Sequence, residues 1–114
     1  MKRKEYVRAE RLFREALQRY AKTLPADHPN VGITRIRLGG ALAGQHRYAE
    51  ANVESLAGYQ ILMKQTSPSV SWLQAARNDL VEEYNALHQP DKAARFRAEL
   101  AKSGDQVPAV ATRP

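Results

Sequence analysis

The sequence predicts an all-α chain of about five helices that pair into repeated antiparallel hairpins. Apolar residues recur at steps of three and four along most of the chain, which is the period of an amphipathic helix. The pattern also matches itself when the chain is shifted by 42 residues. No segment shows a strand pattern bounded by hairpin turns. The expected helices span about residues 3–24, 29–44, 48–65, 69–87 and 90–102.

The first two helices have clear boundaries. Apolar residues form one stripe on 3–24, namely Tyr6, Ala9, Phe13, Ala16, Leu17, Tyr20 and Leu24. Pro25 ends this helix. Pro29 suits the first turn of the next helix, because the N–H that proline lacks has no partner at that position.

Turn residues delimit the remaining helices. The segment GQHR separates the second helix from the third. Ser67 followed by Pro68 predicts an N-cap with proline at the first position of the fourth helix, and Pro90 opens the fifth. Residues 105–114 contain two prolines and no periodicity, so we expect a helical domain over 1–104 and a disordered tail over 105–114.

The 42-residue phase places equivalent residues in successive repeats. Ala9, Ala51 and Ala93 fall on one position, and His46 falls on His88. The recurring alanine is expected at tight contacts, because a small side chain lets a neighbouring helix approach closely. The chain therefore reads as a series of helical hairpins.

Composition excludes several classes of protein. The 114 residues fit one domain, and no apolar run approaches the roughly 18 residues of a membrane span. Without cysteine, disulfides and thiolate sites are excluded, and a reducing cytoplasm is the expected location. The net charge of +6 includes seven basic residues in the first 20 positions. This basic stripe leaves a small nucleic-acid-binding protein as the alternative function, although the interleaved Glu5, Glu10 and Glu15 favour a solvated helix face.

The sequence predicts neither an enzyme nor a metal or cofactor site. All three histidines lie in turns, and no ligand spacing such as H-E-x-x-H occurs. Glu82 and Glu83 are adjacent, so they point in different directions around a helix and do not form an acid–base pair. The glycine-rich segment LGGALAG has no lysine and lies within a helix, where its glycines are expected to allow close helix contact.

The segment LPADHPNVGITRIRLGGALAGQHRYAEA, residues 24–51, resembles a tetratricopeptide repeat of the longer, kinesin-light-chain-like type. The resemblance covers about residues 4–102 and is strongest in this middle repeat. The matching positions are Asp27, His28, Pro29, Leu38, Tyr48, Glu50 and Ala51. It implies a right-handed α-solenoid that serves as a non-catalytic protein-interaction module, as part of or derived from a larger multidomain protein.

The chain departs from the family pattern at several positions. Arg35 and Arg77 stand where an apolar residue is usual, and Ser55 replaces an aromatic residue of the second helix. His46 and His88 replace the glycine between the helices. These departures affect the packing that the family pattern predicts for the second and third hairpins.

The resemblance implies a concave groove, lined by the first helix of each hairpin, that holds a peptide or a partner helix. The candidate groove residues are Ile33, Ile36, Arg37, Gly40, Ala43, Ala75, Asn78, Asp79, Glu82 and Asn85. In the alternative interpretation, Ile33 and Ile36 pack in the core and the polar residues are only solvated. A carboxylate clamp of the kind found in chaperone-binding members is not expected, because Asp79 would repel a carboxylate.

The apolar stripe of segment 3–24 has a further implication. This segment matches the second helix of a hairpin, so half of its stripe would lack the helix that covers it in the other repeats. An exposed apolar patch of this kind usually marks an interface. We therefore expect a homodimer through this helix or a place in a longer array, with Tyr6, Leu12, Phe13, Leu17 and Tyr20 as the candidate self-association residues.

Overall fold

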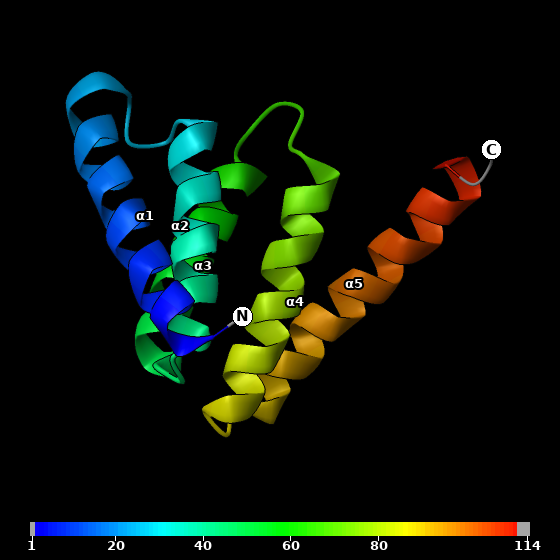
Figure 1. Cartoon of the computed structure of the whole chain (residues 1–114). Helices are drawn as coiled ribbons and strands as arrows, with labels where there is room; N and C mark the ends of the chain where they lie inside the picture. Colours follow the sequence, from blue (N-terminus) through cyan, green and yellow to red (C-terminus); the bar gives the residue numbers. More distant parts are fainter. Residues whose placement is uncertain (1, 112–114) are drawn as a thin grey trace.

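The computed structural model describes the backbone of residues 2–111 and the side chains of residues 2–102, and within this part it is entirely helical (Figure 1). Five helices follow one another along the chain: α1 (Arg3–Thr23), α2 (Pro29–Ala43), α3 (Tyr48–Met63), α4 (Val70–Ala86) and α5 (Pro90–Ala111). The all-α prediction is confirmed, as is the order of the elements.

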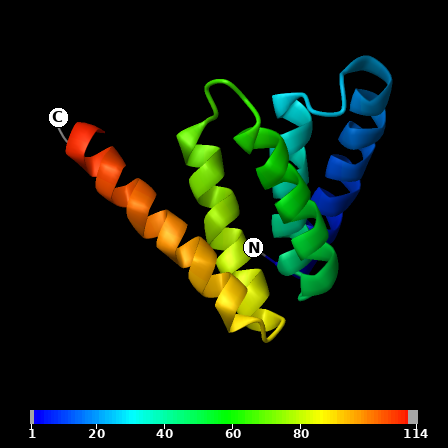
Figure 2. The same ribbon diagram turned by 180° about the vertical axis from the view of Figure 1, so that it is seen from behind.

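The helices pair in the order that the sequence predicts. α2 packs against α3 and α4 packs against α5, so two hairpins follow the single helix α1. The hairpins stack through contacts of α4 with α3 and with α2, and α1 contacts α2. The two views show α2 and α4 on one face of the molecule and α3 and α5 on the other (Figures 1 and 2). This is the arrangement of a helical-repeat solenoid.

The caps explain where the helices begin. His28 is the N-cap of α2: its Nδ1 accepts a 3.0 Å hydrogen bond from the backbone N–H of Asn30, with Pro29 at the first helical position. The N-cap of α4 is Ser69, whose Oγ accepts from the N–H of Trp72. The prediction of Ser67 as this cap is wrong, because the hydroxyl that reaches the free amides of the first turn comes from the residue after Pro68.

The two hairpin turns share a left-handed residue. His46 has φ of 61° and His88 has φ of 59°. In each turn the next residue donates a backbone hydrogen bond to a carbonyl five residues earlier, from Arg47 to Leu42 at 3.0 Å and from Gln89 to Tyr84 at 2.8 Å. This is the Schellman pattern that closes a helix end, and glycine usually occupies the left-handed position. The shared phase of the two histidines thus reflects a repeated turn.

Three apolar clusters follow one another along the solenoid. The first joins α2 and α3, with Phe13 and Leu17 of α1 packed against it; it contains Leu38, Leu42 and Ala51. The second joins α2, α3 and α4, and contains Ile36, Leu62, Leu73 and Ala76. The third joins α4 and α5, and contains Leu80, Tyr84, Ala93 and Phe96. Each helix is therefore held by its neighbours in the array.

The recurring alanine is buried in two of its three positions. Ala51 and Ala93 are fully buried between the helices of their hairpins. Ala9 is only half-buried and lines an open hollow between α1 and α2, so the prediction of a tight contact is wrong there. The reason is geometric: α1 touches α2, and no described first helix covers its alanine.

Glycines set the close approach of α2 to α3. Of the segment LGGALAG, Gly39 has this predicted role, whereas a Cβ at Gly40 would meet no atom within 4 Å. A Cβ added at Gly39 would collide with the Ser55 hydroxyl, and one added at Gly58 would collide with the carbonyl oxygen of Gly32. The short Ser55 side chain fits beside this contact, where an aromatic ring would not. Arg35, the other departure in this hairpin, forms a 2.8 Å ion pair with Glu54 of α3.

The end of the last helix differs from the expectation. α5 continues to Ala111, beyond residue 102 and through most of the segment for which the sequence predicted disorder. Residues 112–114 lie outside the described part of the chain. The division into a domain over 1–104 and a tail over 105–114 stays a prediction.

Candidate interaction surfaces

Two adjoining hollows lie along the exposed face of α2, between α1 on one side and α4 on the other. One has a volume of about 260 Å³ and is lined by Tyr20, Asn30, Ile33, Thr34, Arg37 and Trp72. The other has a volume of about 360 Å³ and is lined by Tyr6, Ala9, Phe13, Arg37, Gly40 and Ala41. We call the two hollows together the α2 groove.

Arg37 belongs to both hollows and is the exposed centre of the α2 groove. Its guanidinium lies 5.0 Å from the centroid of the Trp72 ring, a cation–π contact that orients the charge. Ile33 and Gly40 flank Arg37 at steps of four and three, so the three share one helix face. A Cβ placed on Gly40 would meet no atom within 4 Å, which leaves the backbone of α2 accessible there.

The α2 candidates differ in burial. Ile33, Arg37 and Gly40 line the two hollows, but only Arg37 is exposed, and Ile33 also packs against the second core cluster. Ile36 is only 2% exposed and packs in the second core cluster, so its assignment to the groove is wrong. α3 and α4 converge on that side of α2 and exclude the side chain from any partner. Ala43 is half-buried and packs against the first cluster.

The α4 candidates differ in exposure. Asn78, Glu82 and Asn85 are exposed, while Ala75 and Asp79 are half-buried. Burial, and after it the charge of Glu82, raises the pKa of the Asp79 carboxyl to about 6. These residues recur at steps of three and four, so they lie together on one side of α4.

Sequence reasoning missed Trp72. This side chain stands at the start of α4 and forms one wall of the smaller hollow of the α2 groove. It lies three residues before Ala75, and this spacing alone would have placed it on the candidate face of α4. What the sequence does not show is its pairing with Arg37, 35 residues earlier, because that contact requires the packing of α4 on α2.

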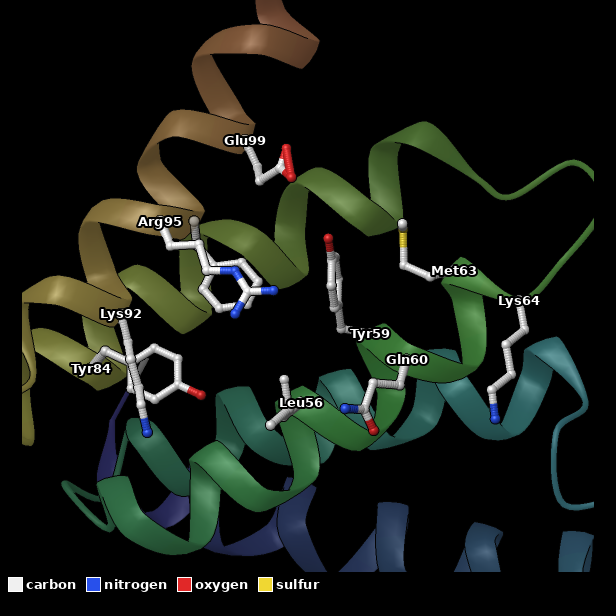
Figure 3. Close-up of a pocket in the computed structure, with 10 residues that line it drawn as sticks. Leu56, Tyr59, Gln60, Met63, Lys64, Tyr84, Lys92, Arg95 and Glu99 are labelled. Carbon is white, nitrogen blue, oxygen red and sulfur yellow. The ribbon is translucent and has the colours of Figure 1, made fainter.

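A larger cleft lies on the opposite side of the solenoid, between α3 and α5 (Figure 3). Its volume is about 720 Å³. Its lining residues are Leu56, Tyr59, Gln60, Met63, Lys64, Tyr84, Lys92, Arg95, Phe96 and Glu99. We call it the α3–α5 cleft. No sequence motif pointed to it, because its walls come from helices of two different hairpins.

The candidate self-association residues lie on different sides of α1. Phe13 and Leu17 pack against the first core cluster and so hold α1 on α2. Tyr6 lies against Gly44, where an added Cβ would collide with its ring. Tyr20 forms a wall of the α2 groove. Leu12 is 52% exposed and Val7 is 48% exposed, and their spacing of five residues places them on different sides of α1.

The described residues show neither a metal-binding cluster nor a membrane-spanning helix. No group of three or more His, Cys, Asp or Glu side chains there converges as a metal ion would require. No described helix combines the length and the apolar character that crossing a membrane requires.

One part of the chain is similar to a known repeat. A family model described as tetratricopeptide repeat matches residues 1–30, which include α1 and the turn from Asp27 to Pro29. The match falls on this first segment rather than on the middle repeat, where the resemblance of the sequence is strongest. No curated protein and no solved structure matches the chain. Tetratricopeptide repeats are in general modules that bind other proteins.

Proposed function

We propose that this protein is a non-catalytic interaction module that binds a peptide or a helix of a partner protein along the α2 groove. The main support for the proposal is that Arg37 lines both hollows. An exposed guanidinium between apolar walls can bind a carboxylate while a ligand side chain enters either hollow. We further propose that the bound segment continues over Asn78 and Asn85, whose amides offer both donors and acceptors.

This proposal includes the role of scaffold within a larger multidomain protein. The similarity to a tetratricopeptide repeat supports it, because the family consists of binding modules rather than of enzymes. The arrangement of α1, α2 and α4 also supports it, because three helices contribute side chains to one elongated face, as an extended ligand requires.

A substitution that fills the groove tests the proposal. Gly40→Leu places a side chain in the larger hollow, where the backbone has open space, and removes a helix-interior glycine at no expected cost to stability. Peptides selected on the wild-type protein from a phage-displayed random library should bind this variant at least about tenfold more weakly. Ala98→Leu, at an exposed site of α5, is the matched control.

A second variant separates the two halves of the face. Changing both Asn78 and Asn85 to alanine should weaken the same peptides while the circular dichroism spectrum stays unchanged. Selected peptides that bind the Gly40→Leu protein as tightly as the wild type would place the binding surface elsewhere. Binding of duplex DNA that tightens steeply as salt is lowered, with no peptide selected, would favour the nucleic-acid alternative.

We also propose self-association through α1. The exposure of Leu12 supports it, because this apolar side chain is about half exposed on a helix whose other side packs on α2. A two-fold pairing would need one self-complementary patch.

A further inference from the structure

We propose that the α3–α5 cleft is a second binding site, separate from the α2 groove, for an acidic peptide segment that presents one aromatic or large apolar side chain. The proposal rests on the shape of the cleft, on its apolar floor and on the charge of its rim. Each of these properties comes from described residues of α3, α4 and α5.

The cleft is large enough for a side chain and the backbone on either side of it. Its volume of about 720 Å³ falls within the range of roughly 300–1,000 Å³ that is usual for ligand sites. Figure 3 shows Leu56, Tyr59 and Met63 of α3 on one side and Lys92, Arg95 and Glu99 of α5 on the other. An extended segment could therefore enter between the two helices without displacing either.

Three packed aromatic rings underlie the cleft. Phe96 forms an edge-to-face contact with Tyr59, with ring centroids 5.5 Å apart, and stacks on Tyr84 at 5.9 Å. These rings belong to three different helices, so they fix the width of the cleft. Leu56 and the half-exposed Met63 extend the apolar surface along α3. Such a surface accommodates an aromatic or large aliphatic side chain.

The rim of the cleft is basic. Lys92 Nζ lies 5.7 Å from the centroid of the Tyr84 ring, and the Arg95 guanidinium carbon lies 5.8 Å from that of Phe96. Lys64 adds a third cation, whereas Glu99 supplies the one carboxylate of the lining. Within the described residues none of these three cations forms an ion pair, in contrast to Arg14, Arg35 and Arg47. Their charge is therefore available to the carboxylates of a ligand.

The same surface favours a peptide over a nucleic acid. Binding of single strands requires ring faces on which successive bases can stack. Tyr84 is only 5% exposed and Phe96 only 7%, because each ring is already covered by its aromatic neighbour and by the core. A single inserted side chain can instead contact Leu56, Tyr59 and Met63 of α3, which are all at least partly exposed.

The probe is a short synthetic peptide of glutamates around one tryptophan, labelled with fluorescein and measured by fluorescence anisotropy. We expect Arg95→Glu to weaken binding about tenfold, and Arg97→Glu, an equal charge change at an exposed position of the same helix outside the cleft lining, by less than about twofold. Arg95→Gln should give an intermediate loss. Raising the salt from about 0.1 M to about 1 M should also weaken binding, because the Debye length falls from about 10 Å to about 3 Å.

Three results would overturn the proposal. If Arg95→Glu and Arg97→Glu lowered the affinity equally, the acidic peptide would be bound only by the general positive charge of the protein. If a peptide with glycine in place of tryptophan bound as tightly, the cleft would not bind an apolar side chain. A single-stranded oligonucleotide that binds more tightly than the peptide, with the same dependence on Arg95, would assign the cleft to nucleic acid.

Amide chemical shifts distinguish this site from the proposed α2 groove. With the glutamate–tryptophan peptide, the largest changes should fall on Leu56, Gln60 and Met63 of α3. Ile33 and Gly40 should change little. The reverse pattern would contradict a second site.

Discussion

The hydroxyl of Ser55 on α3 donates a 2.7 Å hydrogen bond to Oε2 of Glu83 on α4, and neither side chain is exposed to solvent. Asn52 donates a second bond of 3.3 Å to the other carboxylate oxygen. Ser55 stands where the repeat usually has an aromatic residue. The two hairpins are thus joined at this point by a buried polar pair in place of an aromatic contact.

The buried pair makes stability depend on pH. Burial raises the pKa of the Glu83 carboxyl from 4.5 to about 7; the bonds from Ser55 and Asn52 lower it, and the charges of Asp79 and Glu82 raise it further. The folded state therefore binds the proton more tightly than the unfolded state. The contribution of the neutral carboxyl to stability is complete below about pH 4.5 and is lost as the pH rises to about 7.

Glu83→Gln should remove the part of this dependence that comes from Glu83, because the amide stays neutral. Over that interval the variant should lose on the order of 3 kcal/mol less unfolding free energy than the wild type, as measured by urea denaturation at a series of pH values. Asp79, whose pKa is raised from 3.8 to about 6, leaves a second dependence in both proteins. Glu5→Gln, at an exposed position of α1, is the control. A slope that Glu83→Gln leaves unchanged would contradict a proton on this carboxyl.

The recurring alanine should respond differently in its three positions. Ala51→Leu and Ala93→Leu should each lower the unfolding free energy by about 1–3 kcal/mol, because both sites are fully buried and would be overpacked. Ala9→Leu should be tolerated, since its side chain would enter the larger hollow of the α2 groove. Thermal melts compare the three variants with Ala49→Leu at an exposed site. A loss at Ala9 as large as that at Ala51 would contradict the open hollow.

Replacing either turn histidine with glycine should stabilise the protein. His46→Gly and His88→Gly remove the steric cost of a positive φ, which is roughly 1–2 kcal/mol. Glycine also raises the conformational entropy of the unfolded chain, and this offsets part of the gain in stability. A net gain of about 0.5–1 kcal/mol per site is expected in urea denaturation. Ala98→Gly in the interior of α5 should instead destabilise by about 1 kcal/mol. Destabilisation by glycine in both turns would show that the imidazoles contribute contacts that outweigh the strain.

Self-association can be separated from folding because the apolar residues of α1 differ in burial. Leu12→Glu acts on the outer surface and should shift an associated protein toward monomer without changing its melting temperature. Phe13→Glu should lower the melting temperature, because Phe13 packs against the first core cluster. Light scattering coupled to size exclusion measures the first effect. A wild-type protein that is monomeric at high concentration would rule out the pairing.

The sequence by itself determined the helices, their pairing and their turns. A period of three to four residues and prolines at helix starts are local signals, so they predicted five helices before any contact was known. The phase shared by His46 and His88 likewise predicted a repeated turn, because a turn depends on a few consecutive residues. Local chemistry also predicted Pro29 at the start of α2 and the small residues between α2 and α3.

Only the tertiary structure decided which side chains face a partner. Ile33 and Ile36 lie on the same stripe of α2, and the convergence of α3 and α4 buries one and leaves the other in the groove. Ser55 and Glu83 are 28 residues apart, so their bond depends on how two hairpins stack. The α3–α5 cleft exists only because helices of different hairpins stand apart. Contacts between distant segments are set by packing, and no periodicity within one helix encodes them.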